Sequence, residues 1–103
     1  MEAQTPIDIL IVGTNRSIME TIARLIDKDG EWLATIANNQ SEALAICRSK
    51  DFGLALIGAG LSPSEEEELQ QAWSANYPNM PIVKHYGGGS GLLYAEIYKA
   101  LGN

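Results

Sequence analysis

Apolar residues follow two different spacings along this chain. Short, mainly aliphatic runs are typical of strands that are buried on both faces of a sheet. Between these runs, apolar residues recur every three to four positions, which is the spacing of one helix face. The runs lie at residues 7–12, 32–37, 52–57 and 81–86. The pattern therefore predicts four strands, each followed by a helix.

Polar residues with short side chains mark the expected starts of three helices. Ser17 and Glu20 have the spacing of a capping box, in which the two side chains accept hydrogen bonds from amides that the first turn leaves free. Ser62 and Glu65 have the same spacing before the third helix. Asn39 is the expected N-cap of the second helix.

The last helix is expected to bury a wide apolar face. On a helical wheel of about 100° per residue, six residues share one arc and leave Glu96 and Lys99 on the opposite side. The six residues are Leu93, Tyr94, Ile97, Tyr98, Ala100 and Leu101. Two tyrosine rings one turn apart border this arc, and core packing explains them about as well as a protein interface does.

Strands that alternate with helices are usually parallel and joined by right-handed crossovers. The pattern therefore predicts one α/β domain over residues 1–103, built as a three-layer, doubly wound parallel sheet of the flavodoxin-like type. The expected strand order is 2-1-3-4, with helices on both faces of the sheet.

Composition limits the partners of this domain. The formal net charge is −6, whereas binding to nucleic acid needs clustered Lys and Arg, so no nucleic acid partner is expected. No apolar run approaches the ~20 residues that span a membrane, and residues 1–4 do not resemble the start of a signal peptide. The single cysteine, Cys47, fits a reducing compartment and is expected to be a buried core residue. These features predict a cytoplasmic protein without a membrane partner.

Four segments carry a resemblance to a known family. They are the first strand at 9–12, the start of the second helix at 41–45, the third strand at 52–58, and the turn and fourth strand at 77–83. These segments resemble the receiver domain of bacterial two-component response regulators. The resemblance implies a signal-transduction module of a phosphorelay, with its phosphoryl group at the C-terminal edge of the sheet. In that family a carboxylate on the third strand accepts the phosphoryl group and two more carboxylates hold magnesium. A hydroxyl on the fourth strand and a lysine after the fifth strand contact the phosphoryl oxygens.

The residues at these functional positions differ from the family pattern. Gly13 and Thr14 replace the acidic pair, Gly58 replaces the phosphate acceptor, and Tyr86 replaces the hydroxyl residue. Glycine has no side chain to phosphorylate, and magnesium prefers carboxylate oxygens. The lysine has no counterpart, because the chain passes from Tyr86 to the last helix without a fourth crossover helix and fifth strand. The resemblance therefore implies a truncated pseudo-receiver with no catalytic residue, no metal and no cofactor.

The missing strand would leave the fourth strand at an edge of the sheet. In receivers, the face around the last strand and its helices serves dimerisation and signalling. We therefore expect a homodimer through the fourth strand and the last helix. Alternatively, the last helix itself or a strand from another protein covers the edge. The expected interface residues are Ile82, Val83, Lys84, Tyr86, Tyr94 and Tyr98, and Lys84 is alternatively a charge that protects the edge.

A second hypothesis is a small domain that binds an anion or a nucleotide. Glycines occur at the C-terminal tips of the predicted strands, where α/β sheets bind ligands and helix N-termini favour anions. The candidate residues are Thr14, Arg16, Gly87, Gly88, Gly89 and Ser90. Tight turns explain the glycines equally well, and neither a phosphate-loop motif nor a dinucleotide fingerprint is present.

His85 is the only histidine of the sequence. Catalysis would need a positioned partner, and no acid or nucleophile is evident nearby in the sequence. One histidine without paired cysteines does not indicate a metal site. We expect His85 to pack against a helix, and we do not expect an enzyme.

Overall fold

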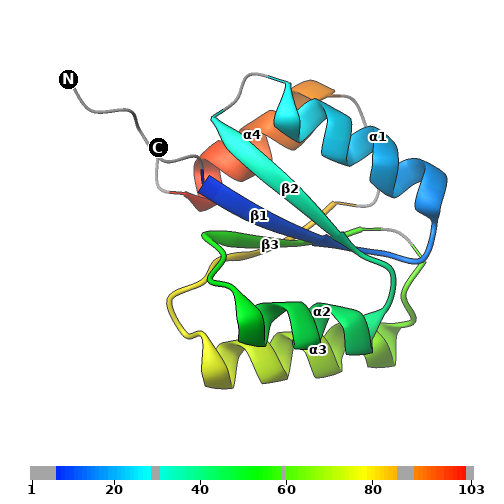
Figure 1. Cartoon of the computed structure of the whole chain (residues 1–103), viewed down its shortest axis with the longest axis vertical. Helices are drawn as coiled ribbons and strands as arrows, with labels where there is room; N and C mark the ends of the chain where they lie inside the picture. The colour runs from blue at the N-terminus through cyan, green and yellow to red at the C-terminus, as the bar shows by residue number, and fades with distance from the viewer. Residues whose placement is uncertain (1–6, 29–30, 59, 86–89, 102–103) are drawn as a thin grey trace.

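The structure is a computed structural model that describes residues 7–28, 31–58, 60–85 and 90–101. Strands and helices alternate along it as the sequence predicts (Figure 1). The elements are β1 (Ile7–Val12), α1 (Arg16–Asp27), β2 (Trp32–Ala37), α2 (Gln40–Ser49), β3 (Leu54–Ile57), α3 (Pro63–Asn76), β4 (Ile82–Lys84) and α4 (Ser90–Ala100).

The strands form one parallel sheet in the order β2-β1-β3-β4, which confirms the predicted topology. β1 lies inside the sheet, where Ile9 is opposite Ala34 of β2 on one side and Leu54 of β3 on the other. β3 also pairs with β4, with Leu56 opposite Val83. β2 and β4 are therefore the two edges of the sheet.

β3 and β4 are shorter than the sequence predicts. β3 begins at Leu54 and not at Phe52, and β4 extends only from Ile82 to Lys84. Pro81, directly before β4, has no N–H to donate, although its carbonyl accepts a 3.0 Å hydrogen bond from a β3 amide. The predicted end of this strand at Tyr86 lies outside the described residues.

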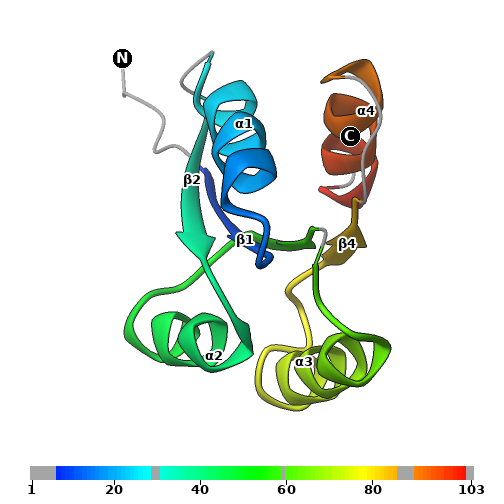
Figure 2. The same ribbon diagram turned by 90° about the vertical axis from the view of Figure 1, so that its right-hand side faces the viewer.

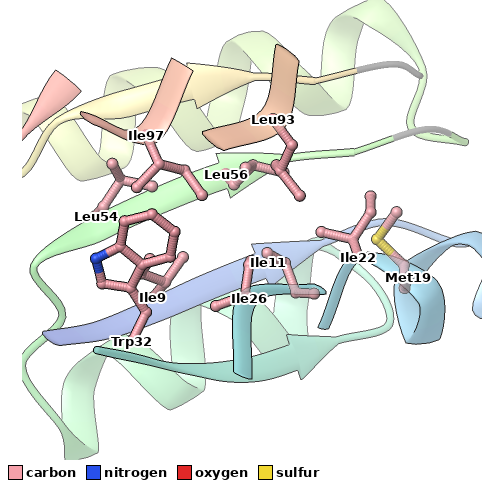
Figure 3. Close-up of a cluster of buried hydrophobic side chains, with 10 residues drawn as sticks. All are labelled: Ile9, Ile11, Met19, Ile22, Ile26, Trp32, Leu54, Leu56, Leu93 and Ile97. Carbon is pink, nitrogen blue, oxygen red and sulfur yellow. The ribbon is translucent and has the colours of Figure 1, made fainter. Parts of the chain in front are cut away.

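Helices cover both faces of the sheet. Figure 2 shows α1 and α4 on one face and α2 and α3 on the other. Because successive side chains of a strand point to opposite faces, the strands contribute to two separate cores. The core beneath α1 and α4 contains Ile9, Ile11, Met19, Ile22, Ile26, Trp32, Leu54, Leu56, Leu93 and Ile97 (Figure 3). The core beneath α2 and α3 contains Leu10, Val12, Ala37, Ala43, Cys47, Ala55, Ile57, Leu61, Leu69 and Trp73.

Two of the predicted helix caps are present. The Asn39 side chain accepts a 2.8 Å hydrogen bond from the Glu42 amide at the start of α2. Ser62 and Glu65 form the reciprocal capping box before α3. These caps satisfy amides that the first helical turn cannot bond internally, and they fix where α2 and α3 begin.

The predicted cap of α1 is wrong. α1 begins at Arg16, so Ser17 lies inside its first turn. The N-cap is Asn15, whose Oδ1 atom accepts a 3.1 Å hydrogen bond from the Ile18 amide. Asparagine is as good an N-cap as serine. Because Asn15 precedes Ser17, the connection between β1 and α1 is shorter than predicted.

Candidate functional site

The C-terminal ends of β1, β3 and β4 meet at one edge of the sheet. The Gly58 amide donates a 2.8 Å hydrogen bond to the Val12 carbonyl, and the His85 amide donates one of 2.8 Å to the Ile57 carbonyl. Gly58 therefore lies between the end of β1 and the end of β4. Gly13, directly after β1, is buried at the same edge. This is the edge at which the sequence places the candidate phosphate site.

The space above Gly58 is filled by the side chain of Met19. A Cβ atom at position 58 would touch the Met19 Cε atom, and it would lie 2.9 Å from Sδ of Met19 and 3.4 Å from the Val12 carbonyl oxygen. Met19 is fully buried and comes from α1; Figure 3 shows it at the end of the core nearest the C-terminal end of β1. Position 58 therefore has no room even for a methyl group unless Met19 moves.

Thr14 packs against Gly60. The φ angle of Gly60 is 105°, a conformation that residues with a side chain rarely adopt. A Cβ atom at this position would touch Oγ1 of Thr14 and lie 3.2 Å from both the Cβ atom and the backbone nitrogen of Thr14. The segments that follow β1 and β3 therefore contact each other directly.

Arg16, a candidate anion-binding residue, uses its charge within the fold. Its Nε atom lies 3.0 Å from Oε2 of Glu20, and its Nη1 atom donates a 3.3 Å hydrogen bond to Oδ1 of Asn38. The structure thus places Thr14 and Arg16 near the same end of the sheet, but the Arg16 guanidinium bonds along α1 and to the segment after β2.

The other candidate anion-binding residues are only partly described. Gly87, Gly88 and Gly89 lie outside the described residues, and Ser90 is the first residue of α4, where its side chain is not described. At α1, α2 and α3, a first-turn amide is bonded to the cap residue of the same helix. At these three helices, that amide is already satisfied within the chain.

His85 is buried at the end of β4 and bonded to α4. Its Nδ1 atom lies 2.6 Å from Oε1 of Glu96, and because a carboxylate only accepts, the ring N–H donates. Packing against a helix agrees with the prediction for His85, which is 4% exposed. Glu96, which the sequence places opposite the apolar arc, reaches His85 directly after β4, and its side chain is 28% exposed. A helical wheel considers one helix alone, so it cannot represent a buried polar partner from another segment, such as His85 directly after β4.

The β4 backbone is open on one side within the described part of the chain. Towards β3, the Pro81 carbonyl accepts from the Ala55 amide, and the His85 amide donates to the Ile57 carbonyl. Alternate residues of a strand direct their N–H and C=O groups to alternate sides. The intervening groups, on residues 82 and 84, therefore point away from β3.

The side chains of β4 are used within the fold. Ile82 packs against the core beneath α2 and α3, and Val83 packs against the core beneath α1 and α4. Lys84 is exposed, with its Nζ atom 3.7 Å from Oε1 of Glu66 on α3. The open part of this expected interface is therefore mainly backbone.

The tyrosines of α4 face away from the β4 edge. The Tyr94 hydroxyl donates a 2.9 Å hydrogen bond to the Leu25 carbonyl of α1, and its ring centroid is 6.0 Å from that of Trp32. The Tyr98 ring meets Trp32 edge-on at 5.0 Å, and its hydroxyl donates to Glu31 over 3.2 Å. The expected interface residues thus divide between the β4 edge and the α1 side of α4, and Tyr86 lies outside the described residues.

Cys47 is buried in the core beneath α2 and α3, as the sequence predicts. Burial raises the pKa of its thiol, and the neighbouring indole of Trp73 opposes part of that rise. The raised pKa favours the protonated thiol, which is the unreactive form. In the described residues, no helix is long and apolar enough to cross a membrane.

Comparisons with known proteins point to one fold. No protein-family model matches the sequence, and no curated protein matches it. Among solved structures, a CheY-like response regulator receiver domain protein from Methanospirillum hungatei JF-1 is 25% identical with a TM-score of 0.72, over 93% of this chain and 76% of that chain. A chemotaxis protein from Vibrio cholerae is 21% identical with a TM-score of 0.72, over 95% of this chain and 82% of that one. A response regulator from Thermotoga maritima is 20% identical with a TM-score of 0.70, over 94% and 79%.

These likenesses extend over nearly all of this chain and agree with its strand order and its helix layers. They also agree with the segments of the sequence that resemble receivers. The chain has the CheY-like, flavodoxin-like fold of response-regulator receiver domains.

Proposed function

We propose that the chain is a pseudo-receiver that cannot be phosphorylated, and that it acts in the cytoplasm as a signalling module through protein–protein contact and not as an enzyme. The receiver fold supports the signalling role. The observation that carries the loss of phosphorylation is the Met19 side chain, which fills the space above Gly58. Gly58 provides no carboxylate, and a side chain at this position would have to displace the end of the Met19 side chain.

The charges near this edge also support the proposal. A phosphoryl group needs cations or a metal ion to stabilise its charge. Arg16 is bonded to Glu20 and Asn38, and Lys84 lies beside Glu66. In the ranges that the structure describes, no cluster of three or more His, Cys, Asp or Glu residues is arranged to hold a metal ion.

For the mode of contact, we favour homodimerisation through β4 and α4. The outward backbone groups of Ile82 and Lys84 can form hydrogen bonds with an added strand. Leu92, which is 51% exposed, lies one turn before Glu96 and therefore on the β4 side of α4. A second copy that pairs along β4 would satisfy the backbone groups and cover this leucine.

Intact-mass spectrometry tests the loss of phosphorylation. The protein is incubated with acetyl phosphate and Mg²⁺, beside a working receiver domain as a positive control. We expect the mass of this protein to stay unchanged while the control gains a phosphoryl group. A phosphoryl adduct on this chain would reject the proposal.

Light scattering over a concentration series tests the dimer. We expect a mass approaching twice the 11.1 kDa of the chain. Lys84→Pro removes an outward N–H and should return the protein to the monomer mass, because proline is tolerated at an open edge but cannot donate to an added strand. A monomer at every concentration, or a Lys84→Pro dimer as strong as the wild type, would reject β4 as the contact.

A further inference from the structure

We propose that Met19 and Thr14 form a lock that holds the ends of β1 and β3 in a single arrangement, so that the module presents its contact surface constitutively. The signalling consequence rests on the proposed function, whereas the lock itself is a property of the packing. The proposed function needs only that no phosphoryl group is accepted. The lock adds that this edge has no second arrangement to which a phosphate donor or another anion could shift it.

The first half of the lock is the contact between Met19 and Gly58. Met19 is the α1 residue whose atoms lie nearest to a Cβ atom at position 58, and it is fully buried. Methionine is long and unbranched, so it fills irregular space next to a backbone. It thereby joins α1 to the end of β3 across the gap that an acceptor side chain would occupy.

The second half is the contact between Thr14 and Gly60, which involves different residues and a different side of the same edge. The backbone of Gly60, at a φ of 105°, approaches the Thr14 side chain more closely than any side chain at position 60 would permit. Gly60 therefore cannot move closer to β1 without displacing Thr14. The two contacts together restrain this edge from two directions.

The charged groups nearest to this edge bond within the fold. Arg16 bonds to Glu20 and Asn38, and His85 bonds to Glu96. A ligand shifts a conformational equilibrium only when it interacts differently with the two states. The ion pair between Arg16 and Glu20 is exposed and weak, so the space above Gly58 is decisive: an anion could enter there only by displacing the Met19 side chain.

A double-mutant cycle on Met19 and Gly58 tests the lock. Urea denaturation is measured for the wild type, Met19→Ala, Gly58→Ala and the double variant. Gly58→Ala should lower the folding equilibrium constant in the wild type, because its methyl group meets Met19. In the Met19→Ala background the same change should lower it about tenfold less, since the methyl group enters vacated space.

Ile26 provides the matched control. It is buried on the same face of α1, two turns beyond Met19. Ile26→Ala should also destabilise the protein, but its effect should add to that of Gly58→Ala without coupling. The cycle therefore separates a specific contact from general softening of the core.

Amide hydrogen exchange gives a second readout. Met19→Ala should accelerate exchange at Gly13 and Gly58, whose buried amides donate to the Ala37 and Val12 carbonyls, about tenfold more than its loss of global stability explains. Ile26→Ala should accelerate these amides only as far as global stability falls. Additive effects in the cycle, or no local acceleration in Met19→Ala, would overturn the lock.

These results are separable from tests of the proposed function. An unphosphorylated dimer with an additive cycle would reject the lock and retain the pseudo-receiver. A phosphoryl adduct together with a coupled cycle would reject the pseudo-receiver and the constitutive signalling drawn from it, and would retain the contact as a feature of packing.

Discussion

The two edges of the sheet are built differently. β2 is six residues long, and the amide of Ala34, near its middle, donates a 2.9 Å hydrogen bond to Oδ1 of Asp27 at the end of α1. β4 is three residues long, and within the described residues its outward groups at Ile82 and Lys84 have no such bond to a side chain. The Asp27 carboxylate thus occupies one outward amide of β2 and hinders pairing of β2 with an added strand. At β4, the short length of the strand and the exposed Lys84 limit such pairing.

The helices beside the two edges also differ. Near the start of β2, Trp32 is covered by Tyr94 and Tyr98 of α4, so aromatic packing closes that corner. Beside β4, α4 is held by the bond between His85 and Glu96. The difference supports β4, and not β2, as the edge for the dimer proposed above, because β2 already uses part of its outward backbone.

The largest expected effect on stability tests which N–H groups of β4 point to β3 and which point outward. Val83→Pro should destabilise the protein by about 3 kcal/mol, because it removes an N–H that points to β3, leaves its acceptor unpaired and disturbs the packing of Val83 on the core. Lys84→Pro should cost about 1 kcal/mol or less, since its N–H points outward and its 3.7 Å ion pair with Glu66 is long and half-exposed on the lysine side. Urea denaturation of both variants measures the difference. Equal losses would show that β4 does not present residue 84 to an open side.

The next effect concerns the bond that holds α4 beside β4. Glu96→Ala should cost about 2 kcal/mol, because it leaves the buried ring N–H of His85 without a partner. Glu96→Gln keeps an oxygen acceptor and should cost about half as much. Thermal or urea denaturation measures both changes. A neutral Glu96→Ala variant would mean that the bond does not hold α4 to this edge.

The smallest effect on stability is expected at β2. Asp27→Ala should cost about 0.5–1 kcal/mol, because the Ala34 amide is near solvent and water replaces the lost acceptor. The mass in solution is the more informative measurement. Because the Ala34 amide is then free to pair with an added strand, light scattering should show species larger than those of the wild type. Asp27→Asn keeps an acceptor oxygen and should leave the mass unchanged. Identical masses for Asp27→Ala and the wild type would show that Asp27 does not protect this edge.

Much of the fold is predictable from local patterns. The four apolar runs and the helical spacing between them predict the element order and the sheet order that the structure shows. Asn39 and Ser62 mark the starts of α2 and α3, because an N-cap acts on amides two or three residues away. The cap of α1 is missed because Asn15 and Ser17 are both good caps, and their spacing does not decide between them.

The sequence by itself determined the order of strands and helices, because periodicity is a local property. It also determined that Gly13, Thr14 and Gly58 have no carboxylate, because side-chain identity needs no structure. Only the tertiary structure placed Met19 above Gly58 and Glu96 against His85, and it turned Tyr94 away from β4. These contacts join residues from different elements, so they depend on how α1 and α4 pack on the sheet. Periodicity shows which face of a helix is apolar, but the partner of each side chain is decided by the elements beneath it.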